Sequence, residues 1–208
     1  MTDCPPREQR VPRGLLHDLA ALDQALYEAV TVTSTPTLDA ALRRLSAAAD
    51  HSKISFAVAG ALALWPGSSR RAAALGVAAI GVASATANLL GKRLVRRPRP
   101  HRAEDSPFPG RHVPMPESAS FPSGHTASAV AFAAAVGTAF PAATLPLGLL
   151  ACAVGYSRVH TGVHYPGDVI AGAVLGTGAA SAVLVAARWE GLTDIRPSAL
   201  APFKAHRK

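Results

Sequence analysis

The sequence has few charged residues, few aromatic residues and almost no cysteine. Charged residues make up 16% and aromatic residues 5% of the 208 positions, whereas about a quarter of a soluble domain is usually charged. Cys4 and Cys152 form neither a disulfide framework nor a Cys-x-x-Cys pair, which argues against zinc and redox chemistry. The first 50 residues contain no continuous apolar run, so we expect no secretory leader.

Apolar residues, mainly alanine, leucine and valine, are abundant at 49% of the chain. Uncharged apolar runs cover 72–90 and 169–187, and shorter runs cover 54–65, 126–140 and 145–156. A bilayer core requires about 20 apolar residues, and the run at 54–65 reaches that length if its helix begins near residue 47. We therefore predict an all-α, integral-membrane helical bundle with about five or six spans in the cell membrane. A buried helical core in a soluble protein is the alternative.

The amino-terminal region has a different pattern. Leucines recur at helical spacing from residue 15 to residue 26, with acidic residues between them, and Pro36 marks a break before a second such segment from about 38 to 45. This spacing predicts two amphipathic helices that lie on the membrane or pack on the bundle. The predicted organisation is a flexible basic tail at 1–13, one helical membrane domain at 14–188 and a polar tail at 189–208.

Two polar segments interrupt the apolar runs. Residues 91–123 hold seven of the seventeen prolines, and residues 157–168 are rich in histidine. The first segment also carries seven cations, namely Lys92, Arg93, Arg96, Arg97, Arg99, Arg102 and Arg111. If the spans alternate in direction, both segments emerge on the same face of the bundle.

Several residues of this face suit a phosphate group. Lys92, Arg99 and Arg158 supply positive charge, and arginine matches phosphate oxygens in a bidentate way. Ser123 and Gly124 precede an apolar run, where a helix amino terminus binds anions through backbone N–H groups. Together these groups can stabilise the charge that develops in phosphoryl transfer.

Three histidines lie among these cations: His125, His160 and His164. Asp168 follows His164 by four residues, so its carboxylate can hold one ring nitrogen and leave the other free to attack phosphorus. The same spacing in His160, His164 and Asp168 is also compatible with a metal site, although Arg158 would repel a cation. A third interpretation, a nucleic-acid surface formed by the arginines at 93–102, lacks interleaved aromatic residues.

The chain resembles the type 2 phosphatidic acid phosphatase (PAP2) family, whose signature has three parts. Lys-x6-Arg-Pro is present as Lys92 to Arg99-Pro100, and Pro-Ser-Gly-His is present at 122–125. Ser-Arg-x5-His-x3-Asp is present as Ser157-Arg158, His164 and Asp168. The three parts occur in order at the ends of apolar runs, which makes them jointly specific.

The resemblance implies a role for each signature residue. It implies that His164 becomes phosphorylated, that Asp168 orients it and that His125 protonates the leaving group. It also implies that the phosphoryl group is held by Lys92, Arg99, Ser123, Gly124 and Arg158. No cofactor and no metal are required. Vanadium haloperoxidases share this kind of site but are larger and mostly soluble, so a short apolar chain favours a phosphatase.

These features predict a metal-independent enzyme that removes phosphate from a membrane lipid. Candidate substrates are phosphatidic acid, phosphatidylglycerol phosphate, a polyprenyl diphosphate and a polyprenyl-linked sugar phosphate of a bacterial envelope, with no nucleic-acid partner. A non-hydrolytic lipid-phosphate binder or carrier is the alternative, although such a binder needs no nucleophile. Fourteen of the 21 Lys and Arg residues fall on the loop face, so we expect the active site to face the cytoplasm. His160 is outside the signature, and we expect it to line the pocket or to have a local role.

Overall fold

In the computed structural model, residues 14–102 and 108–191 are described, and all regular elements within them are helical. The all-α prediction is therefore confirmed for these residues. The predicted tail at 1–13 and most of the predicted tail at 189–208 lie outside the described residues. The elements in chain order are α1 Leu15–Val32, α2 Pro36–Ala48, η1 Asp50–Ser52, α3 Lys53–Ala63, α4 Ser68–Ala85, η2 Thr86–Gly91, α5 Lys92–Leu94, η3 Pro109–Arg111, α6 Gly124–Ala139, η4 Pro141–Ala143, α7 Thr144–His160 and α8 Pro166–Trp189.

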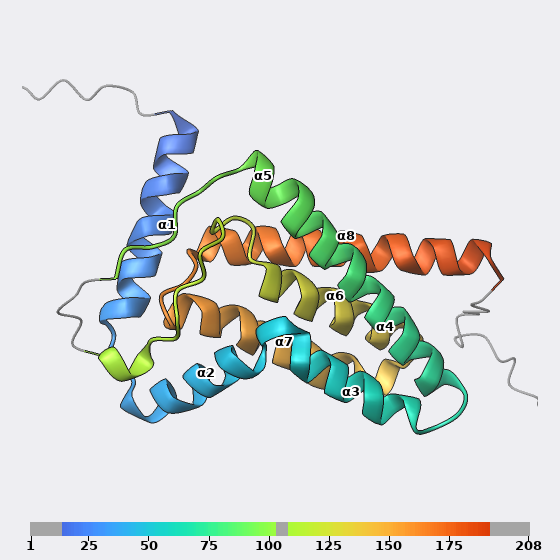
Figure 1. Ribbon diagram of the computed structural model, residues 1–208. Coiled ribbons are helices and arrows are strands. Elements are labelled where there is room, and N and C mark those ends of the chain that lie inside the picture. The colour runs from blue at the N-terminus through green and yellow to red at the C-terminus, as the bar shows by residue number, and fades with distance from the viewer. Residues whose placement is uncertain (1–13, 103–107, 192–208) are drawn as a thin grey trace, which may run out of the picture.

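The two amino-terminal helices agree with the leucine spacing. α1 ends at Val32, and α2 begins at Pro36 because proline is well tolerated in the first turn of a helix. Figure 1 shows that α1 crosses the end of the bundle where the loops gather, whereas α2 continues towards α3. Leu16, Leu19 and Leu22 remain exposed on α1, which suits a helix that lies at a membrane surface.

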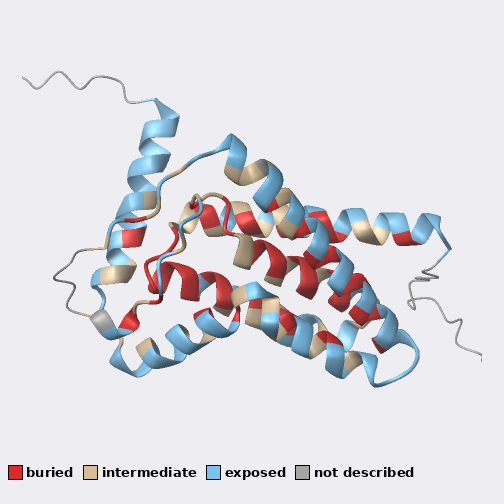
Figure 2. Cartoon of the chain, viewed as in Figure 1, coloured by how far each residue is buried: buried red, intermediate tan, exposed pale blue. Residues whose placement is uncertain are grey.

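The centre of the bundle is α6, which packs against α4, α7 and α8. Its sequence is mostly apolar and rich in alanine on all sides, as in a helix surrounded by others. Ala127, Ala131 and Ala135 are completely buried there. Figure 2 shows this central helix as the most continuously buried element, with exposed residues on the outer helices.

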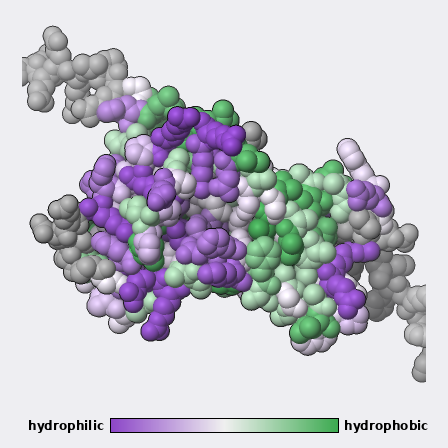
Figure 3. All heavy atoms as spheres, viewed as in Figure 1, coloured by the Kyte–Doolittle hydropathy of each residue, from purple (hydrophilic) through white to green (hydrophobic). Residues whose placement is uncertain are grey.

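Three helical segments among the described residues are long and apolar enough to cross a membrane, namely Ser68–Leu94, Pro141–His160 and Pro166–Trp189. The first combines α4 with the π-helical turn η2 and with α5. Figure 3 shows a hydrophobic zone over the helices, between a broad hydrophilic end near the loops and a smaller hydrophilic area at the opposite end. This pattern is typical of a bundle set in a bilayer.

The condition under which the run at 54–65 would reach spanning length is not met. A helix that begins near residue 47 was required, but α2 ends at Ala48 and α3 begins at Lys53. Between them, His51 and Ser52 adopt left-handed φ angles of 55° and 57°, which interrupt a helix of L-residues. α3 is 11 residues long and α6 is 16, so the count of five or six spans stays a prediction.

α8 packs closely on α6 because Gly176 of α8 has no side chain. We therefore predict that a larger residue at this position destabilises the protein. A Cβ atom added at Gly176 would lie 3.0 Å from the backbone nitrogen of Ala131 and would also press on the carbonyl of Ala127. Because backbone cannot move aside, we expect Gly176→Ala to destabilise the protein by about 1–3 kcal/mol. The measurement is the thermal unfolding midpoint of the detergent-solubilised protein.

Gly178 is the matched control for this change. It lies in the same helix, but a Cβ atom there would have no neighbour within 4 Å. Gly178→Ala should therefore be neutral or stabilising by up to about 1 kcal/mol, the gain in helix propensity. Equal midpoints for the two variants would contradict the packing argument.

Candidate active site

A cavity of about 490 Å³ opens at the end of the bundle where the loops gather. Six of the eight predicted site residues line it: Lys92, Arg99, Gly124, His125, Arg158 and His164. The other two, Ser123 and Asp168, are fully buried and do not line it. The structure therefore brings six of the predicted residues to one cavity, although they come from separate parts of the chain.

The prediction that the two polar segments meet is confirmed by direct hydrogen bonds. Nη1 of Arg99 donates to the carbonyl of Val163 at 2.7 Å. Arg102 donates to the carbonyls of Thr161 and Gly162 at 2.8 and 3.3 Å, and also to that of Val113. Arg102 therefore joins the proline-rich segment to the turn between α7 and α8.

Arg111 is a second structural arginine of the proline-rich segment. Its guanidinium is buried and donates to the carbonyls of Val30, Thr31 and Thr33. These carbonyls belong to the last turn of α1 and the residue after it, where a helix leaves acceptors unpaired. Of the seven cations predicted here, Lys92 and Arg99 line the cavity, whereas Arg102 and Arg111 hold elements together.

His164 is positioned through both ring nitrogens. Nε2 lies 3.2 Å from Nη1 of Arg99, and Nδ1 lies 3.5 Å from Oδ2 of Asp168 and 3.4 Å from Oγ of Ser120. Burial lowers the pKa of His164 to about 4, although its hydrogen bond with Asp168 acts in the opposite direction. At neutral pH the imidazole is therefore uncharged, and the nitrogen beside Arg99 carries a lone pair.

Asp168 is fixed behind His164 by three donors. Its carboxylate accepts hydrogen bonds from the hydroxyl of Ser120 and from the backbone N–H of Tyr165. Arg97 completes the set, because Nη1 bonds Oδ1 of Asp168 at 3.0 Å while Nη2 bonds Asp23 of α1 at 2.6 Å. The carboxylate thus stays ionised and immobile, and α1 is tied to the back of the site.

His125 lies in the first turn of α6, on the other side of the cavity. Its Nε2 is 2.8 Å from Oδ1 of Asp50 in η1. Burial lowers the pKa of His125, the neighbouring Arg158 lowers it further, and Asp50 opposes both effects. The Arg158 guanidinium is held in place by α2, because its Nη1 donates a hydrogen bond to Oγ of Ser46 at 2.7 Å.

Ser123 occupies the amino-cap position of α6, as predicted, but its polar groups are engaged within the protein. Its hydroxyl oxygen accepts from the hydroxyl of Thr126 at 2.9 Å, and its backbone N–H donates to the carbonyl of Asp168 at 2.9 Å. Ser123 therefore connects the first turns of α6 and α8. At this helix terminus it is Gly124 that lines the cavity.

His160 does not line the cavity, so its role is local. Its Nε2 bonds Oδ1 of Asp39 at 3.0 Å, and Arg111 bonds the same carboxylate oxygen at 3.0 Å. Across the described ranges, no group of three His, Cys, Asp or Glu side chains is arranged to hold a metal ion. His160, His164 and Asp168 thus do not converge, despite their spacing.

The functional residues that sequence analysis missed are Asp50, Arg97 and Ser120. Asp50 precedes an apolar run as a single acidic residue, and Ser120 lies in a polar loop, so neither has a signal in the sequence. Arg97 is one of several adjacent arginines, and nothing in the pattern separates it from Arg96. Only contacts across the fold distinguish them.

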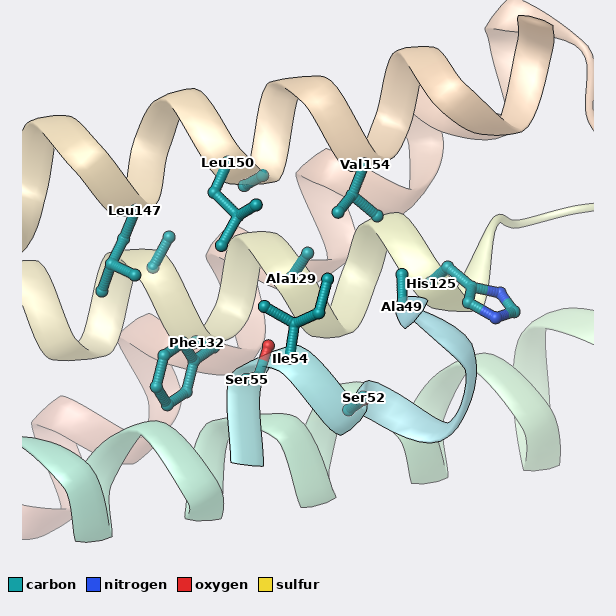
Figure 4. A pocket seen from close by; sticks show the side chains of 12 residues that line it. Ala49, Ser52, Ile54, Ser55, His125, Ala129, Phe132, Leu147, Leu150 and Val154 are labelled. Carbon is teal, nitrogen blue, oxygen red and sulfur yellow. The ribbon is translucent and has the colours of Figure 1, made fainter. Parts of the chain in front are cut away.

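A smaller, mostly apolar crevice adjoins the cavity and shares His125 with it. Its volume is about 20 Å³, and its walls include Ile54, Phe132 and Leu147. Figure 4 shows these side chains between α3, α6 and α7, with the imidazole of His125 at one end. The crevice therefore leads from the charged cavity towards the apolar interior of the bundle.

Comparison with known proteins identifies the family. Residues 72–191 match the PAP2 superfamily. The chain is 38% identical over 171 residues to the decaprenylphosphoryl-5-phosphoribose phosphatase of Mycobacterium tuberculosis, covering 81% of this chain and 88% of that protein. It is 42% identical over 98 residues to a lipid A 1-phosphatase of Rhizobium johnstonii, covering 43% of this chain and 37% of that protein.

Two crystal structures have the same fold. LpxE of Aquifex aeolicus superposes with a TM-score of 0.66 at 25% identity, covering 79% of this chain and 95% of that chain. A transmembrane PAP2-type phosphatidylglycerolphosphate phosphatase of Bacillus subtilis superposes with a TM-score of 0.66 at 21% identity, covering 86% of this chain and 90% of that one. The chain therefore belongs to the PAP2 superfamily, as its three motifs predicted, and is a phosphatase of that superfamily.

Proposed function

We propose that this protein hydrolyses the terminal phosphate of a polyprenyl-linked sugar phosphate in a bacterial membrane. The observation that carries this proposal is the position of His164 at the cavity, where Nε2 lies 3.2 Å from Nη1 of Arg99 and Nδ1 lies 3.5 Å from Oδ2 of Asp168. The substrate class is favoured by the decaprenylphosphoryl-5-phosphoribose phosphatases, which align over most of the chain.

In the first half of the proposed reaction, Nε2 of His164 attacks phosphorus and the bond to the sugar oxygen breaks. His125 donates its proton to that oxygen, which leaves as an alcohol. Lys92, Arg99 and Arg158 neutralise the phosphoryl oxygens, and the N–H of Gly124 at the start of α6 adds a donor. Asp168 holds Nδ1–H of His164 and stabilises the positive charge that the ring acquires.

In the second half, His125 removes a proton from water, and the water oxygen attacks phosphorus. The bond between phosphorus and Nε2 of His164 breaks, which releases inorganic phosphate and restores the neutral imidazole. Positive side chains supply the charge that Mg²⁺ supplies in kinases and GTPases. The proposed reaction therefore involves no cofactor.

The test is phosphate release by detergent-purified protein from a panel of lipids. The panel comprises a polyprenyl-phosphoryl pentose phosphate, phosphatidic acid, phosphatidylglycerol phosphate and a polyprenyl diphosphate. We expect the sugar phosphate to have the highest kcat/KM, by about tenfold or more, which corresponds to about 1.4 kcal/mol of selectivity. Binding of these lipids without phosphate release would instead identify a carrier.

The response to EDTA and vanadate provides a separate prediction. Because arginine and lysine side chains hold the phosphoryl group, activity should be unchanged in excess EDTA. Vanadate should inhibit competitively, since it occupies a phosphate site and can bond to the nitrogen of His164. Loss of activity in EDTA and its recovery with zinc would contradict this mechanism.

The sidedness of the site follows from the charge distribution. Positive residues near membrane spans are retained on the cytoplasmic side, and the sequence predicts that most Lys and Arg residues fall on the loop face. We infer that the cavity opens towards the cytoplasm, at the face where α1 lies across the bundle.

A further inference from the structure

The link between α2 and α3 carries an acidic residue that faces the cavity. Asp50 lies in η1, and Oδ1 of its carboxylate is 2.8 Å from Nε2 of His125 and 3.6 Å from Nη1 of Arg158. The next two residues, His51 and Ser52, have positive φ angles. Such conformations are costly outside glycine and are found where the surrounding structure enforces them, often at functional sites.

We propose that Asp50 is a positioning residue that orients His125 for proton transfer to the leaving group. This inference rests on the proposed function and assigns a further residue to it. Because Nε2 is bonded to the carboxylate, Nδ1 becomes the nitrogen that serves the substrate oxygen. Within the described part of the chain, no protein group occupies that Nδ1 atom. Asp50 thus has the same relation to His125 that Asp168 has to His164.

The electrostatics of the site give Asp50 a second effect. Burial and the neighbouring Arg158 both disfavour the protonated form of His125, which is the form that a general acid requires. The negative charge of Asp50 opposes these two effects. The Asp50 carboxylate also has an unfavourable effect. The Asp50 side chain is 44% exposed and lines the cavity that we propose binds phosphate. A negative group at that position weakens phosphate binding, so its benefit lies with His125.

The motifs of the family do not reveal this residue. Asp50 precedes residues 72–191, over which the chain matches the superfamily. Asp50 lines the cavity in the link between the end of α2 at Ala48 and the start of α3 at Lys53. Figure 4 shows the link, which curves from Ala49 beside His125 to Ser52 at the start of α3.

The test is Asp50→Asn, which keeps the shape and removes the charge. Turnover of lipid phosphates should fall on the order of a hundredfold in kcat, the lower end of what general acid–base catalysis contributes. With p-nitrophenyl phosphate, whose leaving group needs no proton, the burst of nitrophenol should persist with full amplitude. A folding defect is recognised separately, by a lowered thermal unfolding midpoint of the detergent-solubilised variant.

Asp39→Asn is the matched control. The Asp39 carboxylate also contacts a histidine, His160, and an arginine, Arg111, but neither of these residues lines the cavity. This variant should keep the wild-type ratio of lipid to aryl phosphate turnover. In the His125→Ala background, Asp50→Asn should cause no further loss, because both changes remove one function.

Three results would overturn the proposal for Asp50. They are wild-type lipid turnover by Asp50→Asn, a further loss in the double variant, and loss of the burst with full-length folded protein. The last would mean that Asp50 acts through Arg158 on phosphate binding. A wild-type protein that releases no phosphate from any substrate would instead contradict the proposed function.

Discussion

His164→Ala is expected to abolish phosphate release from every substrate, with a loss on the order of 10⁵-fold. The size follows from its role, because no other side chain can form the covalent intermediate, and removal of a nucleophile costs most of the rate. The buried imidazole is neutral at pH 7, since burial lowers its pKa to about 4. Phosphate release and the burst of nitrophenol are the two measurements, and both should disappear.

His160→Gln is the control for this variant. His160 is a second buried histidine, four residues earlier in the chain, and it bonds a carboxylate as His164 does. It lies outside the cavity, so its substitution should leave the burst amplitude per folded molecule unchanged. Acid-labile phosphate trapped on the protein during turnover should map to residue 164. A burst that persists in His164→Ala would show that another residue is the nucleophile.

His125→Ala is expected to separate the two halves of the reaction. On lipid phosphates, whose alkoxide leaving group requires a proton, the loss should be about a hundredfold to ten-thousandfold. On p-nitrophenyl phosphate the first half should still proceed, because nitrophenolate leaves without a proton. Water attack in the second half lacks its base, so the variant should release one burst and then nearly stop.

The chemical state of the stalled protein is the decisive measurement for His125→Ala. Phosphate should remain on His164 in an acid-labile form, and its amount should equal the burst. Steady turnover of the aryl phosphate by this variant would mean that His125 is not the base. Imidazole added to the solution should restore part of the second half, because it can replace a missing base in an accessible cavity.

Much of the site could be predicted because its residues are set by local spacing. His164 and Asp168 are four residues apart at the start of α8, so their approach depends on a single turn. Lys92 and Arg99 are seven residues apart in a short basic stretch that follows an apolar helix. The pairing of these segments required only that the apolar runs alternate in direction, which a membrane bundle imposes.

Other features were beyond prediction because they depend on contacts between distant segments. Asp23, Arg97 and Asp168 are joined in one network although 145 positions separate the first from the last. The use of the Ser123 hydroxyl within the protein likewise depends on Thr126 and on how α6 meets α8. A pattern of residue types carries no information about such partners, since any buried carboxylate can be paired by any nearby arginine.

The sequence by itself therefore determined the all-helical class, the membrane character, the family and six residues that line the cavity. Apolar run length, helical periodicity and the fixed spacing of the motifs are local properties, which the chain carries before it folds. The tertiary structure alone decided that the helix after residue 47 breaks, that Asp50 meets His125 and that His160 turns away from the cavity. These outcomes depend on which buried polar groups can satisfy one another, and that balance exists only once the helices have packed.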